Sequence, residues 1–465
     1  MPIESESGAQ PAPTYSRGYL IWAMGLLFAI YTSNFIDRTL LTVLQQPIKE
    51  ELKLSDAQLG VLGGFAFAVL YSTLGIPIAR MAEKRSRKTI ITGALVVWSI
   101  MTALCGVAGN YATLFAFRVG VGVGEAGASP PAHSLIADYF PPRKRATALS
   151  IYSLGIPIGV LTGSVLGGMI AQRYGWRPAF YILGIPGLIL AVLSQFTLKE
   201  PPRGHSEGGE AADATTPTLR EVIARLGARR SFLHMTAGCS LASFANYGIG
   251  AFAAPYFIRT FHLGLAEAGL VLGLIGGVAA ALGTLGGGLV TDRLGKADKR
   301  WYVWVPAIGQ VAAVPLMVAG YLSPNWRLAV ALLFLPPVVQ YSYLGPSFGL
   351  MHNMVTPRMR ATATALLFLV INFVGLGFGP TLVGVASDLI ATHHFALSGV
   401  AGAFKAMCPG GRPIHGAPVQ VGAACLGASA YGVRWAIVGC TTIYLWAALH
   451  YALAAKRLRE DLTAV

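Results

Sequence analysis

Four charged side chains interrupt otherwise apolar stretches of the sequence. Asp37 and Arg38 lie side by side in NFIDRTLLT, which follows YLIWAMGLLFAIYTS. Arg118 and Glu125 lie about two helical turns apart in FRVGVGVGEAG, so they share one face of a helix. A carboxylate takes up and releases protons, and a guanidinium offers a planar fork of donors that suits phosphate or carboxylate. Together these residue types suggest a site for protons and an anion.

The segments that carry these charges have the composition of membrane helices. The chain has 465 residues, of which 54% are hydrophobic and 12% are charged, and its mean hydropathy is +0.59. A soluble globular domain is about 25% charged. Apolar runs near the ~20 residues of a membrane-spanning helix recur, without β-barrel alternation. We therefore predict a polytopic α-helical membrane protein with twelve spans, at 19–44, 57–79, 89–108, 112–136, 146–171, 178–198, 232–258, 266–290, 301–321, 327–352, 361–390 and 433–454.

Two interpretations of the four buried charges remain open. A charge at the bilayer centre costs about 2.5–3.5 kcal/mol on insertion scales, so such residues normally face the protein interior or a wet pathway. They form either a structural ion pair that joins the first and fourth helices or a site for protons and substrate. We favour the second, because two carboxylates beside two guanidiniums exceed what one clamp needs. In our hypothesis Arg118 pairs with a deprotonated acid when the site is empty, and protonation of that acid releases Arg118 to hold an anionic headgroup.

The basic residues orient the chain in the membrane. Residues 1–18 are a polar tail without the pattern of a removable signal peptide. With this tail inside, 24 of the 35 Lys and Arg residues fall in inner segments and 9 in outer segments. This bias places both termini in the cytoplasm and explains the net charge of +15 better than nucleic-acid binding does. The short loops and tails resemble those of bacterial membrane proteins, which implies a bacterial inner membrane.

A polar linker divides the helices six and six. Residues 199–231 are rich in Pro, Gly, Ala and acidic residues and end in a basic amphipathic piece. They separate a first bundle at 19–198 from a second at 232–454, which a tail at 455–465 follows. We expect the protein to be a monomer.

The two halves repeat each other. PRKRATA at 142–148 returns as PRMRATA at 357–363, and ARMAEKRSRK at 79–88 matches GLVTDRLGKADKR at 288–300. Each match falls between corresponding helices, so the chain resembles a tandem duplication of a six-helix unit.

The same alignment shows that the halves differ in charge. Asp37 corresponds to Asn246, Arg38 to Tyr247 and Glu125 to Gln340. An amide keeps the hydrogen-bonding reach of an acid but does not titrate at physiological pH. Proton chemistry is therefore expected in the first half alone.

Neutral polar and aromatic residues form the expected lining of the second half. Each on its own is better explained by packing or interhelical hydrogen bonding than by contact with a ligand. Together with a charged opposite wall they suit an anionic amphiphile. The residues are Asn246, Tyr247, Gln340, Tyr341 and Asn372.

The inner loops carry charges that are expected to form a cytoplasmic gate. Pairs in corresponding loops are placed to lock the two halves together. The gate residues are Glu83, Arg87, Asp292 and Arg293, with Arg143 and Arg145 from a neighbouring loop.

Cysteines and histidines indicate no metal site or cofactor. Cys408 and Cys425 fall in a predicted external loop at 391–432, where either a disulfide or two free thiols fit. His393 and His394 belong to the same predicted solvated loop.

Glycine and proline clusters predict close packing or bending of three helices. They are the glycines of GIPIGVLTGSVLGG at 155–168, Pro130 with Pro131, and GLGFGP at 375–380.

Several motifs resemble the major facilitator superfamily. GLVTDRLGK after the eighth helix, RYGWRPAF before the sixth and the two sets of six helices carry this resemblance. NFIDRTLL and GVGEAGASPPAHSLIADYFPPRKRATALSIY further resemble its spinster branch, which includes transporters of sphingosine-1-phosphate and lysophospholipids. The resemblance implies roles for Asp37 and Glu125 in protonation and for Arg38 and Arg118 at the substrate headgroup.

We therefore expect a transporter that works by alternating access and couples protons to an anionic amphiphile. An exporter of drugs or small organic anions is the alternative within this class. A membrane sensor that binds such a ligand without moving it is the alternative outside it. The sequence indicates no enzyme, since it places no nucleophile and base together at depth.

Overall fold

The computed structural model describes residues 15–203, 218–356 and 359–463. The described residues form helices and no strands, which confirms the predicted fold class. Ten helices are long and apolar enough to cross a membrane. The helical segments 111–139 and Arg230–Phe261 bring the long segments of the described chain to twelve. Most of the predicted N-terminal tail and the middle of the linker lie outside the described residues.

The first half contains six long helical segments, some of them interrupted. Ser16 begins the first by accepting a hydrogen bond from the N–H of Tyr19, and Lys53 ends it in a left-handed conformation. The helices are α1 (Arg17–Leu52), α2 (Asp56–Gly63), α3 (Phe65–Lys84), α4 (Arg87–Cys105), α5 (Tyr111–Glu125), α6 (Ser129–Tyr139), α7 (Pro142–Ser153), α8 (Gly155–Tyr174) and α9 (Trp176–Thr197).

The second half repeats this plan with two π-helical insertions. Its helices are α11 (Arg230–Phe261), α12 (Leu265–Leu272), η2 (Gly273–Ala279), α13 (Ala280–Gly295), α14 (Trp301–Leu322), α15 (Trp326–Gln340), η3 (Tyr341–Tyr343), α16 (Leu344–His352), α17 (Arg360–Ile371), η5 (Asn372–Phe378), α18 (Gly379–Ala396), α20 (Val419–Thr441) and α21 (Ile443–Thr463). Among the described residues, three short elements lie outside the long segments: α10 (Leu219–Gly227), α19 (Phe404–Met407) and η6 (Pro409–Gly411).

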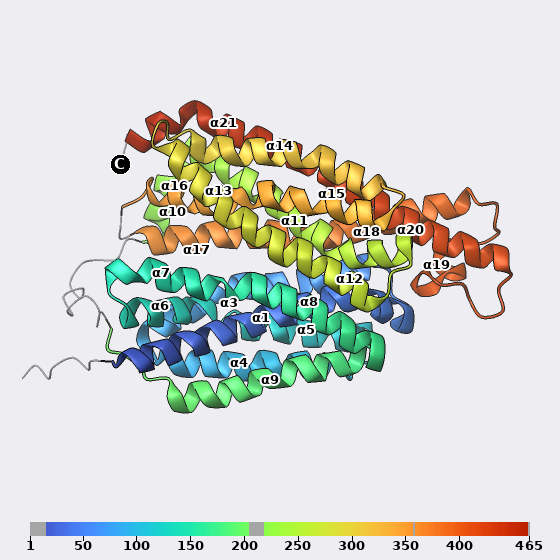
Figure 1. Ribbon diagram of the computed structural model, residues 1–465, viewed down its shortest axis with the longest axis horizontal. Helices are drawn as coiled ribbons and strands as arrows, with labels where there is room; N and C mark the ends of the chain where they lie inside the picture. The colour runs from blue at the N-terminus through green and yellow to red at the C-terminus, as the bar shows by residue number, and fades with distance from the viewer. Residues whose placement is uncertain (1–14, 204–217, 357–358, 464–465) are drawn as a thin grey trace, which may run out of the picture.

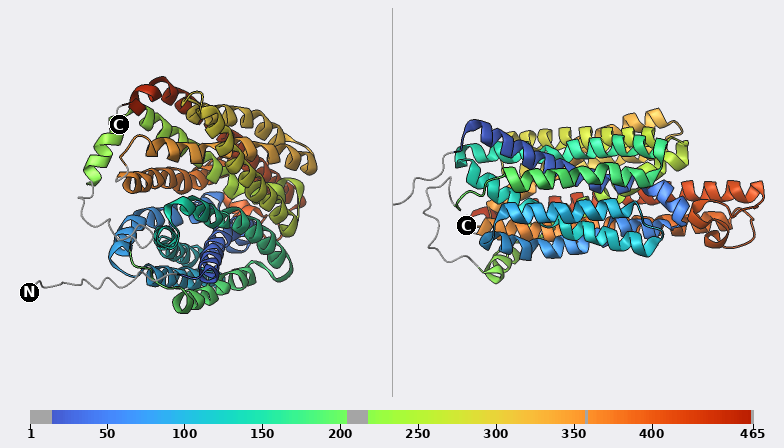
Figure 2. Two further views of the ribbon diagram at one scale, coloured as in Figure 1. Left: turned by 60° about the vertical axis from the view of Figure 1, so that its left-hand side comes forward. Right: turned by 90° about the horizontal axis from the view of Figure 1, so that it is seen from below.

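The halves form two helical bundles that lie side by side (Figure 1). Both ends of the described chain lie at one end of the molecule, which we call the termini end. The connection at 397–418 projects from the other, which we call the loop end (Figure 2). The bundles meet through α2 against α18 and through α8 against α12. Gly60 lies against the backbone of Pro380, and Gly168 against that of Leu265, so the backbones of the two bundles approach closely at both contacts.

The glycines of α8 pack directly against α1. A Cβ atom on Gly159 would lie 2.6 Å from the carbonyl oxygen of Thr32, and one on Gly163 would lie 2.9 Å from the Cα atom of Ile36. Tight packing therefore explains this glycine series. This packing also holds α1 in place at the turn that precedes Asp37 and Arg38.

The other two glycine and proline clusters interrupt their helices. Pro130 and Pro131 cannot donate to the carbonyls of Ala126 and Gly127, so α5 ends at Glu125 and α6 begins at Ser129. The GLGFGP segment lies at the π-helical segment η5 and the start of α18.

The predicted external loop at 391–432 contains more helix than its polarity suggests. α18 continues to Ala396 and α20 begins at Val419, so residues outside these helices number far fewer than 391–432 implies. His393 and His394 are helical, and His394 stacks on Tyr431 with ring centroids 4.2 Å apart. The predicted tail at 455–465 is likewise mostly helical, within α21. Sequence hydropathy ends a span where polarity begins, whereas these helices continue beyond the apolar run. A disulfide joins Cys408 and Cys425.

We predict that Gly163→Ala destabilises the folded protein by about 1–3 kcal/mol, because the added methyl group meets the backbone of α1. Thermal unfolding in detergent measures the effect. Gly288→Ala is the matched control, since no atom lies within 4 Å of its added Cβ position. Equal melting temperatures for the two variants would contradict this packing.

Candidate functional site

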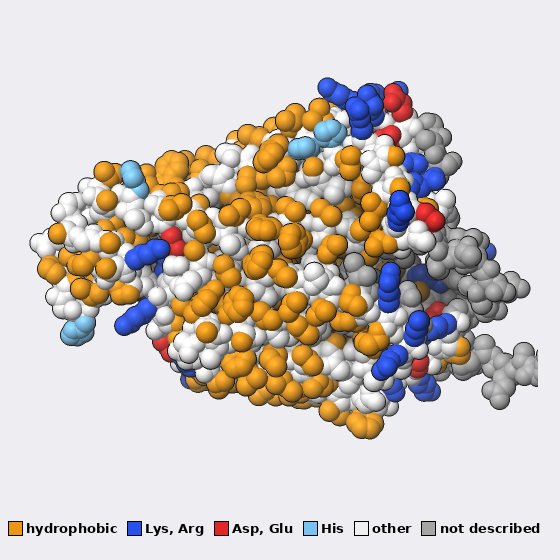
Figure 3. Space-filling model, turned by 180° about the vertical axis from the view of Figure 1, so that it is seen from behind, with side chains coloured by type: hydrophobic (Ala, Val, Ile, Leu, Met, Phe, Trp, Pro, Cys, Tyr) orange, Lys and Arg blue, Asp and Glu red, His pale blue; other side chains and the backbone are white. Residues whose placement is uncertain are grey.

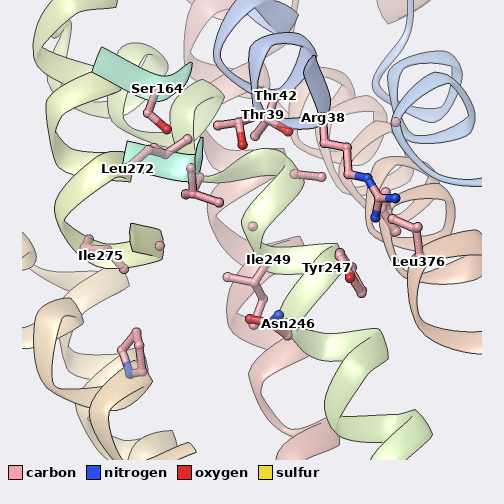
Figure 4. Close-up of a pocket in the computed structure, with 18 of the residues that line it drawn as sticks. Arg38, Thr39, Thr42, Ser164, Asn246, Tyr247, Ile249, Leu272, Ile275 and Leu376 are labelled. Atoms are coloured by element: carbon pink, nitrogen blue, oxygen red, sulfur yellow. The ribbon is translucent and has the colours of Figure 1, made fainter. Parts of the chain in front are cut away.

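A cavity of about 230 Å³ lies between the two bundles (Figure 4). Its walls come from both halves, and its volume holds many water molecules. Two of its lining residues are charged, and both are arginines of the first half, Arg38 and Arg118. The second half contributes neutral polar, aromatic and aliphatic side chains, among them Asn246, Tyr247 and Ile249.

Local structure explains how α5 presents Arg118 to this cavity. Asn110 begins the helix by accepting a hydrogen bond of 2.9 Å from the N–H of Thr113, and it does so about two turns before Arg118. Further along, Gly122 lets α5 approach α3, since a Cβ atom there would lie 2.7 Å from the carbonyl oxygen of Phe67. The helix then ends at Glu125, which places that carboxylate at the break before α6.

Arg38 forms an ion pair with Glu125. Its Nε donates to Glu125 Oε2 at 2.6 Å, from α1 across to α5. The guanidinium carbon also lies 4.5–5.1 Å from the ring centroids of Phe35, Phe67 and Tyr71, within range of cation–π attraction. The Glu125 side chain is fully buried, and 17% of the Arg38 side chain is exposed. The arginine therefore faces the cavity while its acid lies behind it.

The pairing of Arg118 was predicted wrongly. Arg118 forms no ion pair with Asp37 or Glu125. Arg38 is the arginine that forms an ion pair with Glu125. Arg118 lies near enough for its charge to act on Asp37, whose side chain lies beside Trp98 and Thr102. Arg38 reaches Glu125 because the break after α5 leaves that carboxylate facing α1.

Asp37 and Arg118 are buried without full hydrogen bonding. Both carboxylate oxygens of Asp37, and Nε and Nη1 of Arg118, have no partner among the described residues. Asp37 has no exposed surface and Arg118 is 2% exposed. Most buried polar atoms in proteins are satisfied. Such a cluster is suited to accept water, a proton or a ligand.

The second half supplies the opposite wall. Asn246 Oδ1 accepts a hydrogen bond of 2.8 Å from the Tyr341 hydroxyl, and Tyr247 and Gln340 line the cavity with them. Figure 4 shows Arg38 extending toward the side of the cavity that holds Tyr247 and Leu376. Asn372 does not line this cavity. It belongs to the same π-helical segment as Leu376, which does line the cavity, but it lies about one turn closer to the termini end.

The predicted gate residues make their described contacts within their own halves. Arg87 bonds to Asp138 and to Glu200, and Asp292 accepts from the hydroxyl of Tyr302 at 3.0 Å. Arg145 donates to the carbonyl oxygen of Ala137, and the side chain of Glu83 lies outside the described part of the chain. Arg143 and Arg293 are exposed. The cytoplasmic gate remains a prediction, because none of these bonds joins the two bundles.

Sequence analysis missed the aromatic residues around Arg38. Phe67 and Tyr71 come from α3, which hydropathy alone identifies only as an apolar helix. Trp98 and Thr102, beside Asp37, were missed in the same way. Their spacing by about one turn on one face of α4 was the available signal.

Comparisons with known proteins agree with this architecture. The family description of the Major Facilitator Superfamily matches residues 27–380. A protein named MFS-type efflux pump from Mycolicibacterium smegmatis is 35% identical over 79% of this chain and 84% of its own length. Protein spinster homolog 1 from Xenopus tropicalis is 28% identical over 78% of this chain and 72% of its own.

Solved structures show the same relationship. A bacterial homolog of the human lysosomal transporter Spinster, in an inward-facing and unoccupied conformation, superposes with a TM-score of 0.86 at 32% identity, over 96% of this chain and 99% of that one. Its inward-facing, occupied form gives 0.84. The chain therefore belongs to the Major Facilitator Superfamily of membrane transporters and is of the spinster type.

Proposed function

We propose that this protein couples protons to the transport of an anionic amphiphile, such as a lysophospholipid or a sphingosine-1-phosphate-like lipid. The observation that carries the proposal is the cavity lining, which contains two arginines and no carboxylate, while Asp37 and Glu125 lie buried behind them. The rest of the lining is largely apolar, which suits a chain attached to a charged head.

Charge balance links the proton to the anion. In the empty site two guanidiniums and two carboxylates sum to zero. Binding of a singly charged headgroup adds a negative charge in a region of low dielectric constant, and one proton on Asp37 or Glu125 cancels it. Each ligand therefore favours the other, by the same factor in both directions.

In the proposed cycle the bundles move about this cavity and open it alternately to each side. The basic side chains visible at the termini end support a cytoplasmic position for that end (Figure 3). A position in a bacterial inner membrane is consistent with the efflux pump of Mycolicibacterium smegmatis. The named efflux activity of that relative favours a second candidate, export of amphiphilic drugs. The two arginines of the cavity would repel a cation. Export of cationic drugs is therefore less well supported than transport of an anion.

Loss of the proton site should uncouple transport. In proteoliposomes we expect a pH gradient to accelerate wild-type uptake of a fluorescent lysophosphatidic acid, and to leave uptake by Asp37→Asn unchanged. Glu51→Gln serves as the control, because Glu51 pairs with Arg177 on the surface of the first bundle. A gradient response in Asp37→Asn and in Glu125→Gln equal to that of the wild type would refute proton coupling through these acids.

Loss of the free arginine should weaken headgroup binding. Arg118→Ala removes charge-assisted hydrogen bonds, so its affinity for lysophosphatidic acid should fall at least tenfold (about 1.4 kcal/mol or more). Affinity for an uncharged monoacylglycerol of equal chain length should change little, and Arg177→Ala should behave as the wild type does. Tighter wild-type binding of a cationic amphiphile than of the lysophosphatidic acid would instead favour the drug exporter.

The ion pair between Arg38 and Glu125 should be coupled energetically. Glu125→Gln leaves a largely buried arginine without its acid, so we expect thermal unfolding to report a loss of roughly 3–5 kcal/mol. Combining it with Arg38→Gln should cost less than the sum of the single changes. Additive losses would show that the two charges do not interact.

A further inference from the structure

A second set of buried charges joins the two bundles at the loop end. Asp56, at the start of α2, is 1% exposed, and Lys49 of α1 is 2% exposed. Arg259 of α11 and Asp388 of α18 are 8% and 9% exposed. The first two residues belong to the first bundle and the last two to the second. We call these four residues the loop-end cluster.

Asp56 is the centre of this cluster. Arg259 holds it with two bonds, from Nη1 to Oδ2 at 2.7 Å and from Nη2 to Oδ1 at 2.8 Å. Lys49 Nζ donates to Oδ1 at 2.5 Å, and Ser387 Oγ donates to Oδ2 at 2.6 Å. One carboxylate therefore accepts bonds from both bundles, in a geometry that is among the strongest for ion pairs in proteins.

Asp388 makes the reciprocal contact. Its carboxylate accepts the backbone N–H groups of Asp56 and Ala57 at 3.0 and 2.8 Å, so an acid of the second bundle caps a helix of the first. The backbones also touch here, since a Cβ atom on Gly384 would lie 2.2 Å from the carbonyl oxygen of Asp56. No movement of the bundles apart at this end can leave these bonds intact.

Each bundle carries one acid and one base of the cluster. After separation Lys49 remains beside Asp56, and Arg259 and Asp388 stay on α11 and α18, which pack against each other. The charges of the cluster then sum to zero within each bundle. The cluster is therefore able to exchange partners, which suits a contact that forms and breaks repeatedly.

We propose that Asp56 positions the two bundles: its ion pair with Arg259 holds the loop end closed, and transport requires that pair to break whenever this end opens. The proposal needs the bundles to move but does not depend on which molecule is transported. It also gives the loop end a lock that is separate from the cavity and from the predicted gate at the termini end.

Spin labels at Gly109 and Pro324 test this proposal. Both positions are exposed, in loop-end connections of the first and second bundles. The buried free cysteines Cys105, Cys239 and Cys440 would be replaced by alanine, leaving the disulfide. Pulsed electron paramagnetic resonance in nanodiscs then measures the distance across the loop end and the population of a longer, open distance.

Asp56→Asn leaves Lys49 and Arg259 facing one acid, so we expect the open population to rise more than tenfold over that of the wild type. Arg259→Gln leaves an excess acid and should also raise it. Asp56→Asn combined with Arg259→Gln restores neutrality, and its open population should lie below that of Asp56→Asn. This reversal separates an effect of charge from general damage to the fold.

Glu51→Gln is the matched control, because its ion pair with Arg177 lies at the same end but within one bundle. It should leave the distances unchanged. The proposal fails if monodisperse Asp56→Asn and Arg259→Gln proteins keep the wild-type distances, if the control shifts equally, or if the double variant opens at least as far as Asp56→Asn. Such a failure would leave substrate binding by Arg118 untouched.

Discussion

Four buried charges in the first bundle balance one another in a medium of low dielectric constant, and the proposed coupling depends on this balance. Arg38, Arg118, Asp37 and Glu125 sum to zero, and all lie in the first bundle. Water solvates single charges well, but this environment does not, so any added charge demands a partner. In the proposed cycle, an anion that enters the cavity is compensated by a proton, and a proton that enters favours an anion. Coupling follows from this constraint without direct contact between the two ligands.

Backbone packing makes that arrangement possible. The glycines of α8 fix α1 at the turns that carry Asp37 and Arg38, and the prolines after α5 leave Glu125 at a helix end facing Arg38. The second bundle repeats the plan with amides and tyrosines at corresponding positions. The two halves thus form two similar walls, of which one carries the charged residues and the other carries neutral ones. The loop-end cluster carries its charges across both bundles, where they respond to movement.

The sequence predicted the fold class correctly, because long apolar runs are a local signal of membrane helices. It also identified both arginines of the cavity and four neutral residues opposite them. The hypothesis that Arg118 pairs with a deprotonated acid in the empty site failed, since spacing along α5 says nothing about how far Arg38 reaches from α1. The loop-end cluster was missed for a related reason: Arg259 and Asp388 look like ordinary residues near helix ends until the bundles are packed together. Hydropathy misplaced the ends of α18 and α20, where helix continues beyond the apolar run.

Coupling between the anion and the proton can be measured as proton uptake on binding. Purified protein in weakly buffered detergent solution is mixed with lysophosphatidic acid while the pH is recorded, with correction for ionisation of the lipid. The account predicts that the wild type takes up protons in proportion to the bound anion, and that uptake is lost when Asp37 and Glu125 are both replaced by their amides. Saturable binding to the wild-type cavity with no proton uptake at any pH would contradict it.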